Sequence, residues 1–160
     1  MIRLALYQPD IPQNTGTLLR LGSCLNIPIE IIQPAAFALT NRNMARAGLD
    51  YMDRAVLRQH RDFQDFRNSI TAAARMILLT TKASRAHTDV AYAAGDVLLL
   101  GRESSGVPEH VREAADLAVR IPMAHGNRSL NVAIAGAIVV GEALRQLGAF
   151  PQTAAQSTEH

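Results

Sequence analysis

The chain is poor in cysteine and in long apolar runs, and each shortage excludes a class of protein. Its single cysteine, Cys24, rules out an internal disulfide and a cysteine-based zinc cluster, and its apolar surroundings favour a thiol packed in the core. The longest uncharged apolar stretch, residues 132–140, is too short to cross a bilayer. Residues 1–10 lack the basic flank and apolar region of a signal peptide. We therefore expect a cytoplasmic protein without a membrane segment.

Several common site motifs are also missing. The histidines are scattered, with no second ligand at helical spacing, so no metal site is expected. The sequence has no Gly-x-Ser-x-Gly turn, which excludes the usual nucleophile of an α/β hydrolase. It also lacks both glycine-rich phosphate motifs, GxxxxGK[ST] and a GxGxxG after the first strand. Ordinary nucleotide-phosphate binding is therefore unsupported.

The positive charge is almost entirely arginine. The formal net charge is only +2, so no global basic field requires a nucleic-acid partner. However, Lys82 is the only lysine among 16 cationic residues. The planar arginine side chain suits bidentate phosphate contacts and stacking on bases. An arginine-rich genome would produce the same bias, so composition alone leaves RNA binding open.

Apolar runs and turn residues alternate along the chain in a regular order. Strands are expected at residues 2–7, 29–32, 55–59, 76–80, 97–100 and 119–121. A turn-rich loop over residues 9–16 precedes the first helix, and helices are expected at residues 15–25, 40–47, 62–74, 108–115 and 129–147. Alternating elements with continuous apolar strands indicate an α/β fold, a parallel sheet flanked by helices on both faces. Residues 1–148 are expected to form a single domain, and residues 149–160 a disordered tail.

Polar segments follow several of these strands and would meet at one edge of a parallel sheet. The first segment contains Asn14 and Arg20, and the second contains Gly101 and Glu103. Glycine allows a backbone to approach a ligand closely, and Glu103 supplies a carboxylate. The alternatives are a solvated surface charge for Arg20 and an ordinary strand-to-helix loop around Gly101.

The third segment, residues 121–147, joins a polar loop to an apolar helix. Ser129 is the predicted N-cap, and the amides at such a helix start attract polar or anionic groups. The helix is apolar nearly all round as far as Glu142, so it needs cover from its own domain or from a partner chain. A buried core helix after a loop is the alternative for this stretch taken alone.

Five segments in this order resemble the SPOUT superfamily of RNA methyltransferases, and most closely its tRNA (cytidine/uridine) wobble 2′-O-methyltransferases. They are QPDIPQNTGTLLRL, RAGLDY, LLTTK, GRESSGVP and IPM…RSLNVAIAGAIVVGEALRQ, and they extend from about Ile2 to Leu147. The resemblance implies a parallel sheet with a C-terminal trefoil knot. General topology rules would not have predicted a knot, because knots are rare.

The resemblance also implies S-adenosyl-L-methionine (SAM) as cofactor and the anticodon region of tRNA as substrate. Matching positions place the cofactor against Leu79, Gly101, Ile121, Ser129 and Leu130. Arg20 would act on the ribose and its phosphate, from the opposite subunit of a homodimer formed through the C-terminal helix. Because arginine stays protonated, polarisation of the 2′-hydroxyl is favoured over a general-base role. The residues expected to hold the loops and Arg20 in place are Asn14, Glu103 and Asn131.

Two positions depart from the family pattern. Met52 stands where a histidine is common, and Gly141 stands where a tyrosine is common, which leaves the target nucleotide open. Methylation of another tRNA or rRNA nucleotide, or a non-catalytic RNA- or cofactor-binding module, are the alternative functions. Without an added RNA-binding domain, RNA would be read by the surface of the dimer, where the candidate contacts are Arg42, Arg46, Arg54, Arg58 and Arg61. A solvated basic face is the alternative for these arginines.

Overall fold

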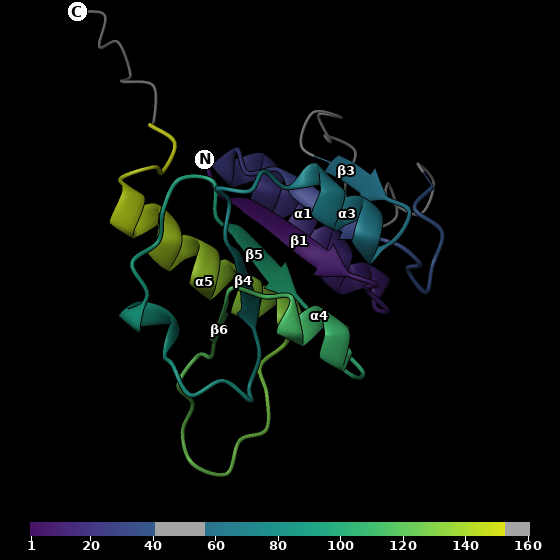
Figure 1. Ribbon diagram of the computed structural model, residues 1–160. Coiled ribbons are helices and arrows are strands. Elements are labelled where there is room, and N and C mark those ends of the chain that lie inside the picture. Colours follow the sequence, from purple (N-terminus) through teal and green to yellow (C-terminus); the bar gives the residue numbers. More distant parts are fainter. Residues whose placement is uncertain (41–56, 153–160) are drawn as a thin grey trace, which may run out of the picture.

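The computed structural model describes residues 1–40 and 57–152, which contain a six-stranded parallel sheet (Figure 1). The strand order is β3-β2-β1-β5-β4-β6, and each neighbouring pair is parallel. The strands are β1 (Arg3–Tyr7), β2 (Ile29–Ile32), β3 (Leu57–His60), β4 (Met76–Leu79), β5 (Val97–Leu100) and β6 (Leu117–Val119). The predicted α/β class with a parallel sheet is therefore confirmed.

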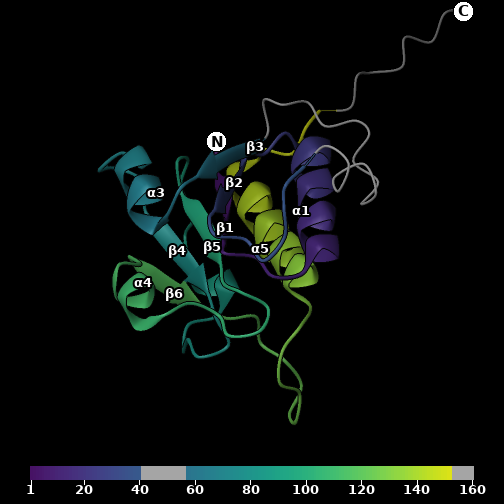
Figure 2. The same ribbon diagram turned by 90° about the vertical axis from the view of Figure 1, so that its right-hand side faces the viewer.

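Helices cover both faces of the sheet. The long helices α1 (Pro12–Leu25) and α5 (Val132–Leu147) lie on one face, and the short α3 (Phe63–Ser69) and α4 (Glu109–Glu113) lie on the other (Figure 2). A single 3-10 turn, η2 (His87–Asp89), follows β4. Alternate β1 side chains serve the two layers: Leu4 and Leu6 join the cluster under α1 and α5, whereas Ala5 and Tyr7 join the other.

Helix α5 approaches the sheet closely at Gly136. A β-carbon at this position would lie 2.9 Å from side-chain carbons of both Leu18 and Leu100. The opposite side of the helix is not covered, because Ile134 is 54% exposed and Ile138 is 38% exposed. The expectation that α5 needs cover on all sides is thus met on one side only by the described residues.

Several predicted boundaries were wrong. Helix α1 begins at Pro12, where a loop was expected, because proline is well accommodated at the first helical position. Helix α3 ends at Ser69 instead of residue 74, because Ile70 has an extended backbone and packs on the apolar cluster. This tertiary contact outweighs the helical preference of the alanines that follow. Strand β6 ends at Val119, two residues before the predicted end.

Cys24 was also misplaced by the prediction, because its side chain is exposed instead of buried in the core. It lies on the outer side of α1, whose inner side is formed by Leu18 and Leu19. The predicted helix at 40–47, the position of Met52 and most of the predicted tail lie outside the described residues. Within the described ranges, no helix combines the length and apolar character needed to cross a membrane.

Candidate active site

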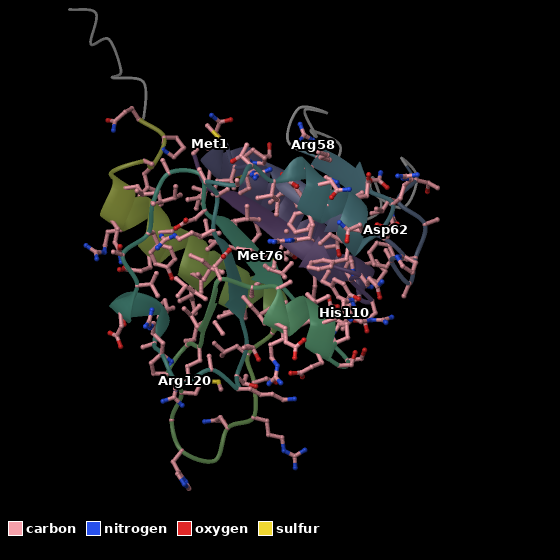
Figure 3. All side chains as sticks on the ribbon, viewed as in Figure 1. Met1, Arg58, Asp62, Met76, His110 and Arg120 are labelled. Carbon is pink, nitrogen blue, oxygen red and sulfur yellow. The ribbon has the colours of Figure 1, made fainter. Side chains whose placement is uncertain are left out.

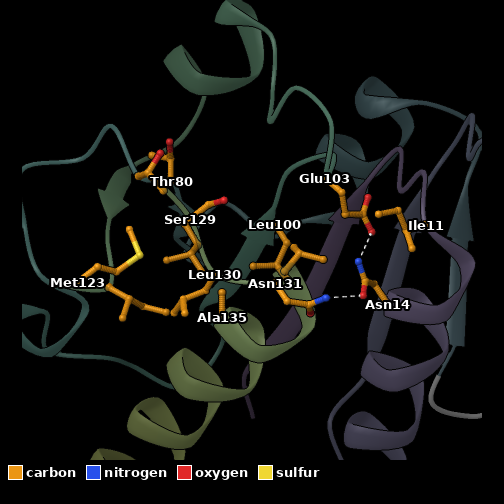
Figure 4. Close-up of a pocket in the computed structure, with 14 residues that line it drawn as sticks. Ile11, Asn14, Thr80, Leu100, Glu103, Met123, Ser129, Leu130, Asn131 and Ala135 are labelled. Carbon is orange, nitrogen blue, oxygen red and sulfur yellow. Dashed lines mark hydrogen bonds between the residues drawn. The ribbon is translucent and has the colours of Figure 1, made fainter. Parts of the chain in front are cut away.

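A cavity of about 340 Å³ opens at the carboxyl ends of β4 and β5, beside the start of α5 (Figure 4). Seven of the nine residues predicted for the site line it: Asn14, Leu79, Glu103, Ile121, Ser129, Leu130 and Asn131. The sequence analysis missed Thr80, Thr81 and Met123, which line the same cavity. Thr80 and Thr81 follow β4 directly, and Met123 lies four residues after β6, so all three are near the edge where ligands bind in parallel sheets.

A chain of side-chain hydrogen bonds crosses this cavity (Figure 4). Asn131 is the N-cap of α5, because its Oδ1 accepts from the backbone N–H of Ala133 at 2.8 Å and of Ile134 at 3.3 Å. Its Nδ2 donates to Oδ1 of Asn14 at 2.8 Å, and Nδ2 of Asn14 donates to Oε1 of Glu103 at 3.3 Å. The starts of α5 and α1 and the loop after β5 are thereby connected.

The direction of this chain follows from the helix cap. Since the amide oxygen of Asn131 is engaged by α5, its nitrogen must face Asn14, and Asn14 must in turn present its own nitrogen to Glu103. Glu103 is therefore an acceptor, which is the role of an ionised carboxylate. The prediction of Ser129 as N-cap was wrong, because α5 begins three residues later and Ser129 lies in the cavity wall.

Asp10 holds Glu103 from the other side, a role that the sequence analysis missed. The backbone N–H of Asp10 donates to Oε2 of Glu103 at 3.0 Å, and the backbone N–H of Glu103 donates to Oδ1 of Asp10 at 3.1 Å. The hydroxyl of Ser104 donates to the second carboxylate oxygen of Asp10. This reciprocal pair fastens the loop after β1 to the loop after β5.

The two carboxyl groups have opposite pKa shifts. Burial, and then the side chain of Asp10, raises the pKa of Glu103 above the ordinary glutamate value. The pKa of Asp10 is lowered to about 2, first by its side-chain interaction with Glu103 and then by the hydroxyl of Ser104 and backbone amides. Asp10 thus remains ionised at acidic pH, and Glu103 is the member of the pair that takes up a proton first.

Gly101 closes the loop after β5. Arg102 and Gly106 exchange two backbone hydrogen bonds of 2.9 Å, and a β-carbon on Gly101 would lie 2.7 Å from the carbonyl carbon of Gly106. Gly101 does not line the cavity of Figure 4. Together with Leu79 it lines an adjoining hollow on the α4 side of the strand ends.

Arg20 lies apart from the cavity. It is exposed on α1, the helix that also carries Asn14, and it does not line the cavity in the single chain. Of the five arginines considered for RNA contact, Arg58 and Arg61 are exposed, and the other three lie outside the described residues. In the part of the chain that the structure describes, no group of three histidine, cysteine or carboxylate side chains could hold a metal ion.

Known proteins match nearly the whole chain. The model of the SpoU rRNA methylase family matches residues 1–141. The tRNA (cytidine(34)-2'-O)-methyltransferase of Ancylobacter novellus is 51% identical over 95% of this chain and 97% of its own length. A solved structure described as "Structural insights into the 2-OH methylation of C/U34 on tRNA" has a TM-score of 0.87 and 38% identity, and covers 92% of this chain and 97% of its own.

A further solved structure contains the cofactor that the resemblance implied. The AdoMet-bound rRNA methyltransferase of Sinorhizobium meliloti has a TM-score of 0.81 and 26% identity, and the match covers 91% of this chain and 56% of that one. The family model, the relative and both solved structures each match most of the chain. The chain belongs to the SpoU rRNA methylase family.

Proposed function

We propose that this protein is a SAM-dependent methyltransferase that modifies the ribose 2′-hydroxyl of the wobble nucleotide, cytidine or uridine 34, of tRNA. The relative from Ancylobacter novellus is named as a tRNA (cytidine(34)-2'-O)-methyltransferase and matches 95% of the chain at 51% identity, and the solved structure at 38% identity is described by methylation of C/U34. The observation that carries the proposal is the cavity itself, which gathers Asn14, Glu103 and Asn131 from three separate loops. Residues 1–148 would act as one methyltransferase domain.

The cavity fits SAM in size and in chemistry. Its volume of about 340 Å³ lies within the usual range for small-molecule sites. Leu79, Leu100, Ile121 and Leu130 supply apolar walls suited to an adenine ring. The polar rim is suited to the ribose and the amino-acid part, and Gly101 lets the loop after β5 lie close to its neighbour. Bound there, SAM supplies a methyl group that is already activated by its sulfonium.

The task left to the protein is alignment and proton transfer. Arg20 would hold the ribose and its phosphate and polarise the 2′-hydroxyl, whose proton would pass to a phosphate oxygen. A guanidinium suits this role because it donates in a fixed planar geometry and stays protonated. Asn14, Glu103 and Asn131 would fix the cavity loops and the start of the helix that carries Arg20.

A homodimer would bring Arg20 to the cavity of the opposite subunit. The exposed isoleucines Ile134 and Ile138 lie one turn apart on α5, and Ile11 beside the start of α1 is 40% exposed. Apolar side chains spaced by four residues form a strip suited to helix packing. We place the dimer contact on this strip, and we place the trefoil knot in the segment that leads from β6 to α5.

The decisive experiment is methyl transfer from labelled SAM to tRNA transcripts with cytidine, uridine or a purine at position 34, followed by digestion and nucleoside mapping. We expect 2′-O-methylcytidine or 2′-O-methyluridine at position 34. Label at another nucleotide, or in rRNA, would replace the proposed substrate. Binding of SAM without labelling of any RNA would instead support a non-catalytic module.

Two variants test the roles of Arg20 and of the dimer. Arg20→Lys keeps the charge but loses the planar fork, so we expect a large loss of kcat with unchanged SAM affinity. Near-normal turnover would refute the fork-geometry role. Ile138→Glu should convert a dimer into monomers in sedimentation experiments, because it places a charge on the apolar strip. A dimer that persists with wild-type affinity would exclude this contact.

A further inference from the structure

A second hollow adjoins the active-site cavity, on the segment between β6 and α5. Its volume is about 340 Å³, and it extends from Thr81 across Arg120 to Arg128. It shares Thr81, Ile121 and Met123 with the active-site cavity. The loop that forms its outer wall projects from the body of the molecule (Figure 1), and Arg120 lies at the base of this loop (Figure 3).

The arginines that line this hollow have no anionic partner among the residues that the structure describes. Two arginines line the hollow, Arg120 and Arg128, and within residues 1–40 and 57–152 no ion pair or side-chain hydrogen bond engages either of them. Six other described arginines are paired with carboxylates, whereas Arg20, Arg58, Arg67 and Arg85 are not; the paired ones are Arg3, Arg61, Arg75, Arg102, Arg112 and Arg145. The sequence has no aspartate or glutamate between Asp116 and Glu142, so the loop supplies no counter-charge of its own.

The base of this basic hollow is anchored by backbone hydrogen bonds. The N–H of Arg120 donates to the carbonyl of Arg85 at 2.9 Å, and the carbonyl of Arg120 accepts from the N–H of His87 at 2.8 Å. The backbone at Arg120 is therefore fixed against the loop that follows β4. Gly126, with a φ of 88°, takes the left-handed conformation that lets the outer wall turn back towards α5.

We propose that this basic hollow binds phosphate groups of the RNA backbone next to the nucleotide that enters the active site. The inference deepens the proposed function and rests on it. A guanidinium group can bind two phosphate oxygens at once. Because these arginines have no ion pair within the described part of the protein, RNA can bind them without breaking one. The carboxylate of SAM has the same oxyanion chemistry, but its single negative charge balances only one of the two unpaired arginines.

The salt dependence of RNA binding provides the test. The dissociation constant of substrate tRNA would be measured between 50 and 200 mM salt for wild type, Arg120→Gln, Arg128→Gln and the double variant. Each phosphate contact contributes about 0.7–0.9 to the slope of log affinity against log salt, which is about threefold over this range. We expect each substitution to reduce the slope by about this amount and to leave SAM affinity within about twofold.

Arg67→Gln is the matched control. Arg67 is also without an ion pair among the described residues, but it lies on α3, on the opposite face of the sheet (Figure 2). Its removal should leave the slope unchanged. A double variant with wild-type slope and tRNA affinity would overturn the inference, as would weakened SAM binding with unchanged RNA binding, which would assign the hollow to the cofactor. Wild-type protein that methylates no RNA would overturn the proposed function itself.

Discussion

Replacing Gly101 by alanine should open the loop after β5 and weaken cofactor binding. The new β-carbon would lie 2.7 Å from the carbonyl carbon and 2.8 Å from the α-carbon of Gly106, which are backbone atoms and cannot rotate away. Relief requires Gly106 to move, and with it the two 2.9 Å hydrogen bonds that it exchanges with Arg102. The substitution therefore acts on the loop closure as a whole.

Two independent estimates of the cost agree. Overpacking of a well-packed site costs typically about 1–3 kcal/mol. Loss of two backbone hydrogen bonds, at about 0.5–1.5 kcal/mol each, amounts to about the same. For a chain of this length such a loss lowers the melting temperature by roughly 3–9 °C. Because Gly101 adjoins Leu79 at the cavity edge, we also expect at least tenfold weaker SAM binding, which corresponds to about 1.4 kcal/mol.

Thermal unfolding at fixed protein concentration, together with calorimetric titration of SAM, would measure both effects. Ser105→Ala is the control, because Ser105 lies in the same loop, is exposed and makes no side-chain hydrogen bond among the described residues. It should leave both quantities unchanged. A Gly101→Ala protein with wild-type melting temperature and SAM affinity would refute the argument from steric closure.

Three other predictions test the site and the core. Asn131→Ala removes the cap of α5 and should lower the free energy of unfolding by about 1 kcal/mol in thermal unfolding. The control Ser129→Ala should change it by less than about 0.5 kcal/mol, and equal effects would contradict the cap assignment. Activity should fall at acidic pH, because Glu103 takes up a proton at its raised pKa. Asp10→Asn should shift this fall to lower pH, because it removes a negative charge beside Glu103. An unchanged pH profile would exclude coupling between the two carboxyl groups. Phe66→Ala should cost about 3–5 kcal/mol in urea unfolding, since Phe66 is fully buried, and a loss below about 1 kcal/mol would show that the core collapses around the gap.

The parallel sheet and the edge that carries the site could be predicted from the sequence for a physical reason. Strands buried on both faces must be apolar throughout, as in MILL of β4 and VLLL of β5, and helices on both faces follow from that pattern. Once the strands are parallel, the segments after them share one edge. The sequence therefore predicts that Asn14, Glu103 and Asn131 lie near one another.

The predictions were wrong where two residues of similar chemistry could fill the same role, or where the role of a residue depends on a partner distant in the sequence. Ser129 and Asn131 are both good N-caps by local preference, and Asn131 is selected because Asn14 lies opposite it. Asp10 carries no local motif, and its role depends on Glu103, 93 residues away. Cys24 is on the outer side of α1, which the apolar character of the helix did not reveal.

The hydrogen bond between Asn131 and Asn14 joins two ends of the chain that are 117 residues apart. The side chain of Asn131 caps α5 and also lines the cavity. The first turn of this helix therefore cannot fray without opening the binding site. Local unfolding of the helix start and release of the ligand thus become a single event. A ligand at one hundred times its dissociation constant would oppose that event by about 2.7 kcal/mol, and the C-terminal helix would be held most firmly when the enzyme is loaded.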